Sequence, residues 1–340
     1  MTLPSRPDGS NVGPGAPPLI GRRQLVALAI TSALPLAGHA QSFPARPVSI
    51  VVPFPPGGTT DIAARAIALE MGKLLGQSVT VDNRAGAGGN VGGEFAVRAA
   101  PNGYTLFMTT TNIHAINPLL YSKMSFDPNK DFAPVAPLLL GSLVLLLHPS
   151  VKANNVKELI AFAKANPGRL TVASAGAGTI NHLAAELFKK MAGVYIVHVP
   201  YRGAAPALAD LIGGQVDMMI DGIASAIPHI RTGKLRGIAT SGAKRSDALP
   251  ELPTIAEAGL PGFEATFFFG LLAPAGTPRE VIQRLNAEAT KGANTPEFRE
   301  RMSAAGLELV SGSADKLADM IRTDVARWAP VVKATGMKID

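Results

Sequence analysis

The sequence predicts an α/β fold in which helices flank mainly parallel sheets. From Phe43 onward, short apolar runs typical of buried strands alternate with segments whose apolar residues recur at helical spacing. Short glycine-rich or polar joins separate them, which is the pattern of consecutive βα units. The chain has 340 residues, of which 47% are hydrophobic and 17% charged, so it is long and apolar enough to form two domains.

The first 40 residues are expected to be a signal peptide. Arg22 and Arg23 precede an apolar run at residues 25–37, which is too short to span a bilayer but suits a signal h-region. Gly38 and Ala40 are the small residues of a cleavage site after Ala40. The arginine pair is compatible with either the general or the twin-arginine export route. The product is therefore expected in the periplasm, and without cysteine it can form no disulfide.

The net charge of +7 is spread along the chain without a run of lysine or arginine. No basic stripe is interleaved with aromatic residues, which make up only 5% of the chain. A nucleic-acid partner is therefore not expected.

The stretch VSIVVPFPPGGTTD at residues 48–61 has the features of a strand, a sharp turn and a helix start. Its prolines end the strand, and Gly57 and Gly58 permit close backbone approach. Thr59 or Thr60 can cap the following helix, with Asp61 in its first turn. The free N–H groups and the dipole of such a helix start suit an anion. An ordinary βα turn has the same sequence features.

A glycine-rich segment, residues 83–100, follows the next predicted strand at 78–83. It is not a dinucleotide fingerprint, because G-x-G-x-x-G beginning at Gly86 would need glycine in place of Val91. We interpret it either as a second anion-facing loop or as a close-packing joint. The strand at 104–110 then ends in a cluster of hydroxyl side chains, and a short helix is expected at 114–121.

The rest of the chain continues the alternation. An aliphatic run at residues 138–147 predicts a central strand, and a capped helix should follow at 154–168. The theme of strand, glycine loop and helix then recurs twice, with its loops near residues 174–179 and 200–205. Residues 279–340 should be largely helical. Further strands are expected at 194–199, 216–220, 233–242 and 307–309.

Loops of the anion-binding type thus occur near residues 56–61, 86–92, 174–179 and 200–205. In doubly wound sheets such loops gather at the carboxyl ends of the strands, where ligands bind. Two lobes that each present a pair of these loops could hold a small anion from both sides. The pattern therefore favours a binding function.

Signatures of catalysis are missing from the sequence. The histidines lack the spacing of a metal site, and neither a G-x-S-x-G elbow nor a phosphate-binding P-loop is present. Ser241 and Lys244 fit S-x-x-K by letters, but no companion motif accompanies them. We therefore expect no enzymatic activity, no metal and no cofactor.

A set of motifs in a fixed order resembles the Bug/TctC family, the extracytoplasmic receptors of tripartite tricarboxylate transporters. The resemblance covers nearly the whole chain after the signal. It is carried by PFPPGGTTD (53–61), NRAGAGGNVGGE (83–94), PNGYTL (101–106), VPYRGAAPALADLIGGQVDMM (199–219), LPELPTIAEAGLPGF (249–263) and GLLAPAGTP (270–278).

The resemblance implies a two-lobed periplasmic binding protein of type II, the Venus flytrap architecture. The chain would cross between the lobes near residues 140–147 and 262–268. The first lobe would then hold residues 43–143 and 266–340, and the second lobe residues 144–265. A small carboxylate would bind between the lobes, and the receptor, expected to be a monomer, would deliver it to the permease subunits in the membrane.

The resemblance also implies which residues contact the ligand. Two alternatives come from the residues themselves: Asp61 could instead stabilise its helix N-terminus, and His182 could be a surface or packing histidine. Asp221 ends a strand and could accept from a hydroxyl or ammonium group of the ligand. The full set is Phe54, Gly57, Gly58, Thr59, Asp61, Thr109 and Thr110 from the first lobe, and Ser174, Gly178, Thr179, His182, Tyr201, Gly203 and Asp221 from the second.

Two other functions are compatible with the same expected fold. One is a sensory module whose ligand-bound form docks on a membrane regulator such as a histidine kinase. The other is a periplasmic hydrolase or lyase, which would require turnover of the bound acid. Which carboxylate is bound does not follow from the sequence, because it depends on a few loop atoms.

Overall fold

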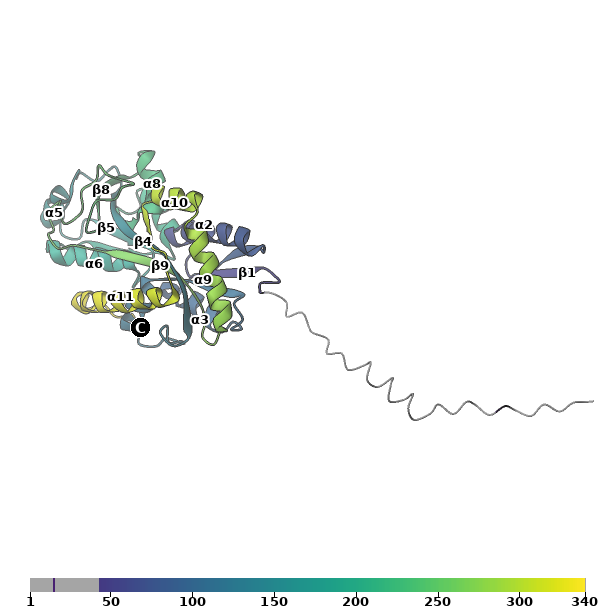
Figure 1. Cartoon of the computed structure of the whole chain (residues 1–340). Coiled ribbons are helices and arrows are strands. Elements are labelled where there is room, and N and C mark those ends of the chain that lie inside the picture. The colour runs from purple at the N-terminus through teal and green to yellow at the C-terminus, as the bar shows by residue number, and fades with distance from the viewer. Residues whose placement is uncertain (1–14, 16–42, 340) are drawn as a thin grey trace, which may run out of the picture. The chain divides into compact units, whose positions relative to one another are not determined.

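The computed structural model describes residues 15 and 43–339 (Figure 1). The predicted signal peptide, residues 1–40, and its cleavage site lie outside the described residues, apart from Gly15. Within the described part of the chain, no helix combines the length and the apolar character needed to cross a bilayer.

The N-terminal part alternates strands and helices as the sequence predicts. The first strand ends at the prolines, and the π-helical turn replaces the first half of the short helix expected at 114–121. The elements are β1 (Val48–Val52), α2 (Thr59–Leu75), β2 (Val79–Asn83), a 3₁₀ turn (Ala87–Gly89), α3 (Asn90–Val97), β3 (Thr105–Thr110), a π-helical turn (Asn112–Ile116) and α4 (Asn117–Leu120).

The middle part contains the strands and helices of the second predicted lobe. Its elements are β4 (Phe132–Leu147), α5 (Val156–Ala165), β5 (Thr171–Ser174), α6 (Ile180–Ala192), β6 (Val197–Pro200), α7 (Ala204–Ile212), β7 (Met218–Gly222), α8 (Ile223–Arg231) and β8 (Arg236–Thr240). The C-terminal part holds β9 (Thr266–Pro274), α9 (Arg279–Ala293), α10 (Pro296–Ala304), β10 (Leu307–Leu309) and α11 (Ala314–Thr335).

The strands pair in the order β2-β1-β3-β9-β4-β7-β5-β6, and β8 and β10 pair with β4. Pairing is parallel among β1, β2 and β3 and among β5, β6 and β7. The pairs that involve β4 or β9 are antiparallel. We call the part built on β1, β2 and β3 the first lobe and the part built on β5, β6, β7 and β8 the second lobe.

Strand β4 connects the two lobes. Its residues up to Ser142 pair with β9, and from Leu143 onward they pair with β7 and β8. The sequence predicts only residues 138–147 of this strand, because Pro134 and Pro137 interrupt the aliphatic pattern before it. The structure accommodates both prolines, with register shifts against β9 between Pro134 and Ala136 and between Pro137 and Leu139.

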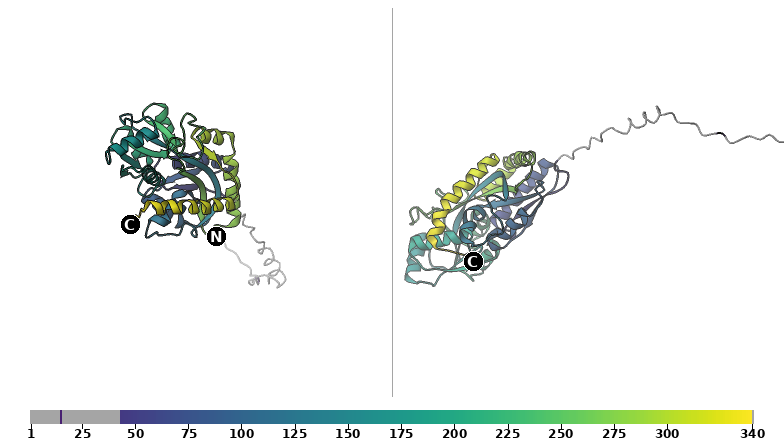
Figure 2. Two further views of the ribbon diagram at one scale, coloured as in Figure 1. Left: turned by 90° about the vertical axis from the view of Figure 1, so that its left-hand side faces the viewer. Right: turned by 90° about the horizontal axis from the view of Figure 1, so that it is seen from below.

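Helices cover the sheets of both lobes (Figures 1 and 2). Helix α2 packs against α9, where Gly292 lets the two backbones approach: a Cβ there would lie 3.1 Å from Glu70 Cβ. Helix α11 packs against β4, the π-helical turn and α6, so it touches both lobes. Strand β1 is almost wholly buried, which explains why valine and isoleucine occupy every position except Ser49.

The glycine-rich segment after β2 forms a packing joint. A Cβ at Gly92 would lie 2.9 Å from Pro53 Cα, and a Cβ at Gly93 would lie 2.4 Å from Phe126 Cζ. Only glycine allows these contacts. Of the two interpretations drawn from the sequence, the structure therefore favours the packing joint.

Candidate functional site

A cavity of about 60 Å³ lies between elements of the two lobes. The first lobe contributes the loop after β1 and the ends of β3 and α2, and the second lobe contributes the loops that open α6, α7 and α8. Strands β4 and β9 form the remaining wall. The lining residues are Phe54, Pro55, Gly58, Thr59, Thr60, Thr110, Asn112, Leu143, Ala175, Ile180, Asn181, Ala204, Asp221, Gly222, Phe267 and Phe269.

Four helix N-termini meet at this cavity. Helix α2 reaches it with Gly58 and Thr59, α6 with Ile180, α7 with Ala204 and α8 with Gly222. Each helix start presents backbone N–H groups without a partner inside its own helix, together with the positive end of the helix dipole. The four helix dipoles therefore contribute positive potential at their meeting point, where no lysine or arginine lines the cavity.

None of these four helices has a side-chain cap from its own N-cap residue. Three of their N-cap residues are glycine, and the fourth, Thr179, directs its hydroxyl to Gly176 O at 2.8 Å. By contrast, Asn155, Thr295 and Ser313 cap α5, α10 and α11 with their own side chains. The N-cap residues of these four helices thus leave the N-terminal donors of their own helices without a side-chain partner.

Polar side chains join the two lobes at the edge of the cavity. Thr59 Oγ1 lies 3.1 Å from Ser225 Oγ, at the starts of α2 and α8. Asn112, just after β3, donates to Gly178 O at 3.1 Å and accepts from Ile180 N at 3.2 Å. The Asn112 side chain therefore caps a helix of the opposite lobe.

Glycines permit close approach of the lobes at two points. A Cβ at Gly203 would lie 2.5 Å from the Pro55 ring, and the residue has a φ of 129° that favours glycine. A Cβ at Gly222 would lie 2.1 Å from Thr59 Oγ1, although its φ of −56° would allow any residue. At Gly222 the constraint is therefore contact with the other lobe and not backbone conformation.

Asp221 is the single ionisable side chain among the described residues that line the cavity. It is 2% exposed and accepts hydrogen bonds from Asn181 Nδ2 at 2.8 Å and Ser225 Oγ at 2.7 Å. Burial raises the pKa of this carboxyl, and the hydrogen bonds from Ser225, Gly222 and Asn181 only partly oppose the rise. Asp221 thus adds negative, not positive, charge to the cavity when ionised.

Five of the residues expected from the sequence line the cavity together: Phe54, Gly58, Thr59, Thr110 and Asp221. The other nine lie around it, where most are held by hydrogen bonds within their own lobe. They are Gly57, Asp61, Thr109, Ser174, Gly178, Thr179, His182, Tyr201 and Gly203. The structure therefore separates the residues that line the cavity from those that shape its loops.

Asp61 organises the loop after β1. Its carboxylate accepts from Gly57 N at 3.0 Å, Arg65 Nε at 2.9 Å and Asn83 Nδ2 at 2.9 Å. Burial acts to raise the pKa of Asp61, but these donors and the Arg65 charge lower it below its usual value. This arrangement corresponds to the alternative role, in which Asp61 stabilises a helix N-terminus.

His182 belongs to a polar cluster behind the loop at residues 174–179. Its Nδ1 accepts from Gly178 N at 3.1 Å, and its ring stacks on His198 with centroids 3.7 Å apart. Ser174 Oγ lies 2.7 Å from His198 Nε2. Burial, followed by the neighbouring His182, lowers the pKa of His198 to about 4. These contacts correspond to the packing alternative for His182.

Tyr201 and Thr109 are also not among the residues that line the cavity. The Tyr201 hydroxyl donates to Asp210 Oδ2 at 2.7 Å, and burial together with Asp210 raises its pKa to about 12. Thr109 is fully buried on β3, and its hydroxyl has no hydrogen-bond partner among the described residues.

Glu186 belongs to the same polar cluster as His182, with its Oε1 3.5 Å from His182 Nε2 and 2.6 Å from Lys189 Nζ. Replacing Glu186 by glutamine is expected to weaken this cluster. Burial alone would raise the pKa of Glu186, but His182 and Lys189 lower it to about 2. Since this is below the unfolded value, the ionised carboxylate stabilises the fold above about pH 4.5 and loses this effect as the pH falls toward 2. Glu186→Gln should therefore lower the free energy of unfolding by on the order of 2 kcal/mol at pH 7.

Urea unfolding between pH 2 and pH 7 measures this difference. The two proteins should converge as the pH falls below 4.5, and a difference independent of pH would contradict the assignment. Glu94→Gln is the control, because Glu94 pairs with Arg98 at the surface, where little change is expected.

Sequence reasoning missed several residues that line the cavity. Asn112 follows the hydroxyl cluster at the end of β3, so its position was a usable signal. Gly222 comes directly after Asp221 and begins a fourth helix at the cavity, which the sequence reading did not include among its loops. Phe267 and Phe269 lie far along the chain on β9, and no local signal indicates their place.

Within the described residues, no group of three or more histidine, aspartate or glutamate side chains is arranged to hold a metal ion. The residues at the cavity can donate backbone hydrogen bonds and exclude water. Two α/β lobes joined by crossing strands, with helix N-termini around a cavity between them, define a periplasmic binding protein.

The chain belongs to the family described as tripartite tricarboxylate transporter family receptor, which matches residues 63–337. This confirms the resemblance to the Bug/TctC family, and the family is one of periplasmic solute receptors. Among its relatives, Protein BugT of Bordetella pertussis is 37% identical over 301 residues, covering 88% of this chain and 92% of BugT.

Solved structures confirm the two-lobed fold. The R. palustris protein Rpa4515 with adipate is 38% identical, with a TM-score of 0.85, and the match covers 87% of this chain and 99% of that one. MatC of Rhodopseudomonas palustris with bound malate is 35% identical, with a TM-score of 0.81, covering 85% of this chain and 100% of MatC.

Proposed function

We propose that this protein captures a small carboxylate in the cavity between its lobes and delivers it to the permease of a tripartite tricarboxylate-type transporter. The observation that carries the proposal is the meeting of four helix N-termini at one cavity, three of which have glycine as the N-cap residue. Such a site binds an anion through backbone N–H groups and helix dipoles. The adipate and malate in the two related structures support a carboxylate.

The helix N-termini can bind an anion strongly because they lie at a partly buried cavity and because their donors are fixed in position. A single helix N-terminus stabilises an anion by about 0.3–1 kcal/mol when exposed and by up to about 2 kcal/mol when partly buried. Four of them acting together can offset the desolvation of one carboxylate. Because the donors belong to helices, they are already oriented before the ligand arrives.

The proposed lobes are residues 43–143 with 266–340, and residues 144–265. The change of pairing partners between Ser142 and Leu143 on β4 supports the first boundary, and the start of β9 at Thr266 supports the second. A ligand held by both lobes favours the closed conformation over the open one. The closed form would present a different surface to the permease.

The same proposal places the protein in the periplasm as a monomer after cleavage behind Ala40. Periplasmic location agrees with the family and with the charged and apolar pattern of residues 21–40.

Thermal unfolding of the chain from Gln41 onward, against carboxylates, amino acids and neutral analogues, tests the proposal. The protein should first be unfolded, freed of any carried ligand and refolded. A carboxylate at a hundred times its dissociation constant should add about 2.7 kcal/mol, which raises the melting temperature by several degrees. Stabilisation by neutral compounds only, or by none of the panel, would contradict a carboxylate receptor.

A further inference from the structure

The two connections between the lobes lie side by side on the crossing strands. Strand β4 changes its pairing partners between Ser142 and Leu143, and β9 begins at Thr266, which is the cross-strand partner of Ser142. Because the two crossings are neighbours, a rotation of one lobe against the other has its axis close to this pair. Ser142 and Thr266 therefore mark the hinge between the two proposed lobes.

The ligand cavity and a larger groove lie on opposite faces of the crossing strands. Side chains alternate between the two faces of a strand, and directly paired residues share a face. Phe267 and Phe269 line the cavity between the lobes. Phe268 and its cross-strand partner Leu140 line a groove of about 910 Å³. Phe267 also borders this groove, where its ring packs beside Gly141. The groove thus lies behind the hinge as seen from the cavity.

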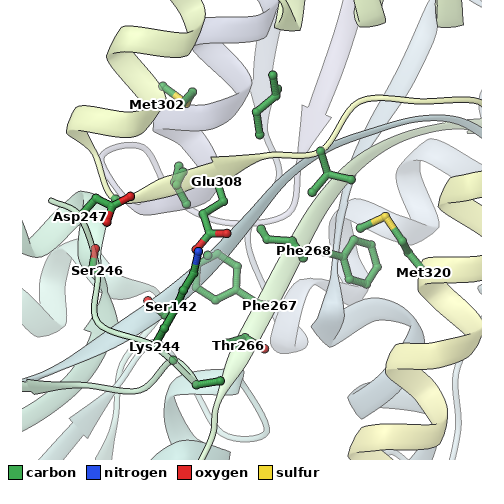
Figure 3. A pocket seen from close by; sticks show the side chains of 18 of the residues that line it. Ser142, Lys244, Ser246, Asp247, Thr266, Phe267, Phe268, Met302, Glu308 and Met320 are labelled. Atoms are coloured by element: carbon green, nitrogen blue, oxygen red, sulfur yellow. The ribbon is translucent and has the colours of Figure 1, made fainter. Parts of the chain in front are cut away.

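Both lobes form the walls of the groove, and the crossing strands form its floor. The second lobe contributes the loop at residues 242–248 after β8, and the first lobe contributes α10, β10 and α11. Met302 of α10 and Met320 of α11 are among the apolar side chains that line it (Figure 3). The width of the groove therefore depends on the angle between the lobes.

Two ion pairs join the lobes across the groove. Lys244 and Glu308 point toward one another, with Nζ and Oε1 3.4 Å apart (Figure 3). Arg327 Nη1 lies 3.3 Å from Glu264 Oε1. All four side chains are between 39% and 73% exposed, and ion pairs in contact with solvent contribute little to stability. These pairs therefore present little resistance to a change in the width of the groove.

On the cavity face the two lobes are in contact. Thr59 Oγ1 lies 3.1 Å from Ser225 Oγ, and Asn112 is hydrogen-bonded to the opposite lobe. The lobes are therefore closed around the cavity while the groove on the other face is wide. Since the hinge lies between the two faces, a rotation that opens the cavity brings the walls of the groove together.

We propose that the groove behind the hinge controls the affinity of this receptor, because it must narrow whenever the cavity opens. A side chain that fills the groove resists this narrowing and shifts the population toward the closed conformation. The apparent affinity then rises by the factor by which the closed population grows. This inference rests on the proposed function, since it assumes that a ligand is held between the closed lobes. It adds a surface that the ligand does not touch and from which its affinity is set.

Tryptophan substitutions that fill the groove test the inference. Leu140→Trp fills it from the floor and Ala243→Trp from the wall of the second lobe; both residues are exposed, and neither lines the cavity. In isothermal titration of the refolded, ligand-free proteins with malate and adipate, each variant should bind at least about fivefold more tightly than the wild type. Damage to packing would not produce such a gain in affinity.

Leu69→Trp is the matched control. Leu69 is an exposed leucine of α2 that lines neither the groove nor the cavity, so this variant should bind like the wild type. If Leu140→Trp does not fold, Ala243→Trp, in an exposed loop, decides the question. Folded groove variants that bind no more tightly than the wild type would overturn the inference and leave the proposed function standing.

Small-angle X-ray scattering of the ligand-free proteins gives a second readout that needs no bound acid. The groove variants should have a smaller radius of gyration than the wild type and Leu69→Trp, because more of their molecules are closed. Absence of wild-type binding to malate, adipate and the wider thermal panel would overturn the proposed function. In that case an unchanged radius of gyration in the groove variants would overturn the hinge inference as well.

Discussion

Replacing Gly222 by alanine is expected to abolish ligand binding while the protein stays folded. The new Cβ would lie 2.1 Å from Thr59 Oγ1 and 3.0 Å from Thr59 Cβ, so rotating the Thr59 side chain does not remove the contact. Because Thr59 and Gly222 belong to different lobes, separating the lobes does remove it. The φ and ψ of Gly222, −56° and 135°, are accessible to alanine.

The expected loss of affinity is on the order of a hundredfold or more, which corresponds to a closed form reduced to about one per cent of the population. Titration with the carboxylate that stabilises the wild type most measures this loss. The free energy of unfolding without ligand should change by less than about 1 kcal/mol.

Gly213→Ala is the matched control for this variant. Gly213 lies in the same lobe at the end of α7 with a φ of −75°, and its nearest potential contact is 3.4 Å from the new Cβ. It should bind like the wild type. The double variant Thr59→Ala, Gly222→Ala should recover part of the affinity. It removes the contact with the threonine hydroxyl and leaves only the contact of 3.0 Å between the new Cβ and the Cβ of residue 59. Wild-type affinity in Gly222→Ala would contradict closure around this cavity.

Replacing Asn112 by leucine should weaken binding by on the order of a hundredfold. The asparagine side chain pairs Gly178 O and Ile180 N of the other lobe, and leucine would leave both buried and unpaired when the lobes meet. Each unpaired group costs about 1–3 kcal/mol, and this cost applies to the closed form alone. The effect should therefore appear in ligand affinity more than in the stability of the free protein.

Asn117→Leu separates this effect from a general loss of packing. Asn117 is also fully buried, but its side chain donates to Gly88 O and Asn90 Oδ1 within the first lobe. This variant should lose stability in urea and keep its ligand affinity. If both variants lost affinity equally, the bridging role of Asn112 would be wrong.

Local features of the sequence were sufficient for much of the fold. The prolines after Val52, the glycine pair at 57–58 and the paired threonines place the turn and the start of α2 within a residue or two. Strands such as β5 and β10 follow from short apolar runs between turn residues. The sequence also places Asp221 at the end of a strand, and in the structure it is the last residue but one of β7.

What local reasoning could not supply depends on contacts between distant segments. The sequence left Gly92 and Gly93 open between an anion-facing loop and a packing joint, because only the folded structure brings Pro53 and Phe126 near them. His182 begins a helix at the cavity, but its ring stacks on His198 from another strand. Phe267 lies at the cavity only because β9 pairs with β3 and β4.

The measurement that tests the central claim most directly compares a carboxylate with its own primary amide. The ligand should be the acid that stabilises the protein most, titrated into the refolded, ligand-free chain beside an uncharged amide of nearly the same shape. If helix N-termini hold the ligand through its negative charge, the amide should bind at least about a hundredfold more weakly. Equal affinities for acid and amide would contradict an anion site at the four helix N-termini.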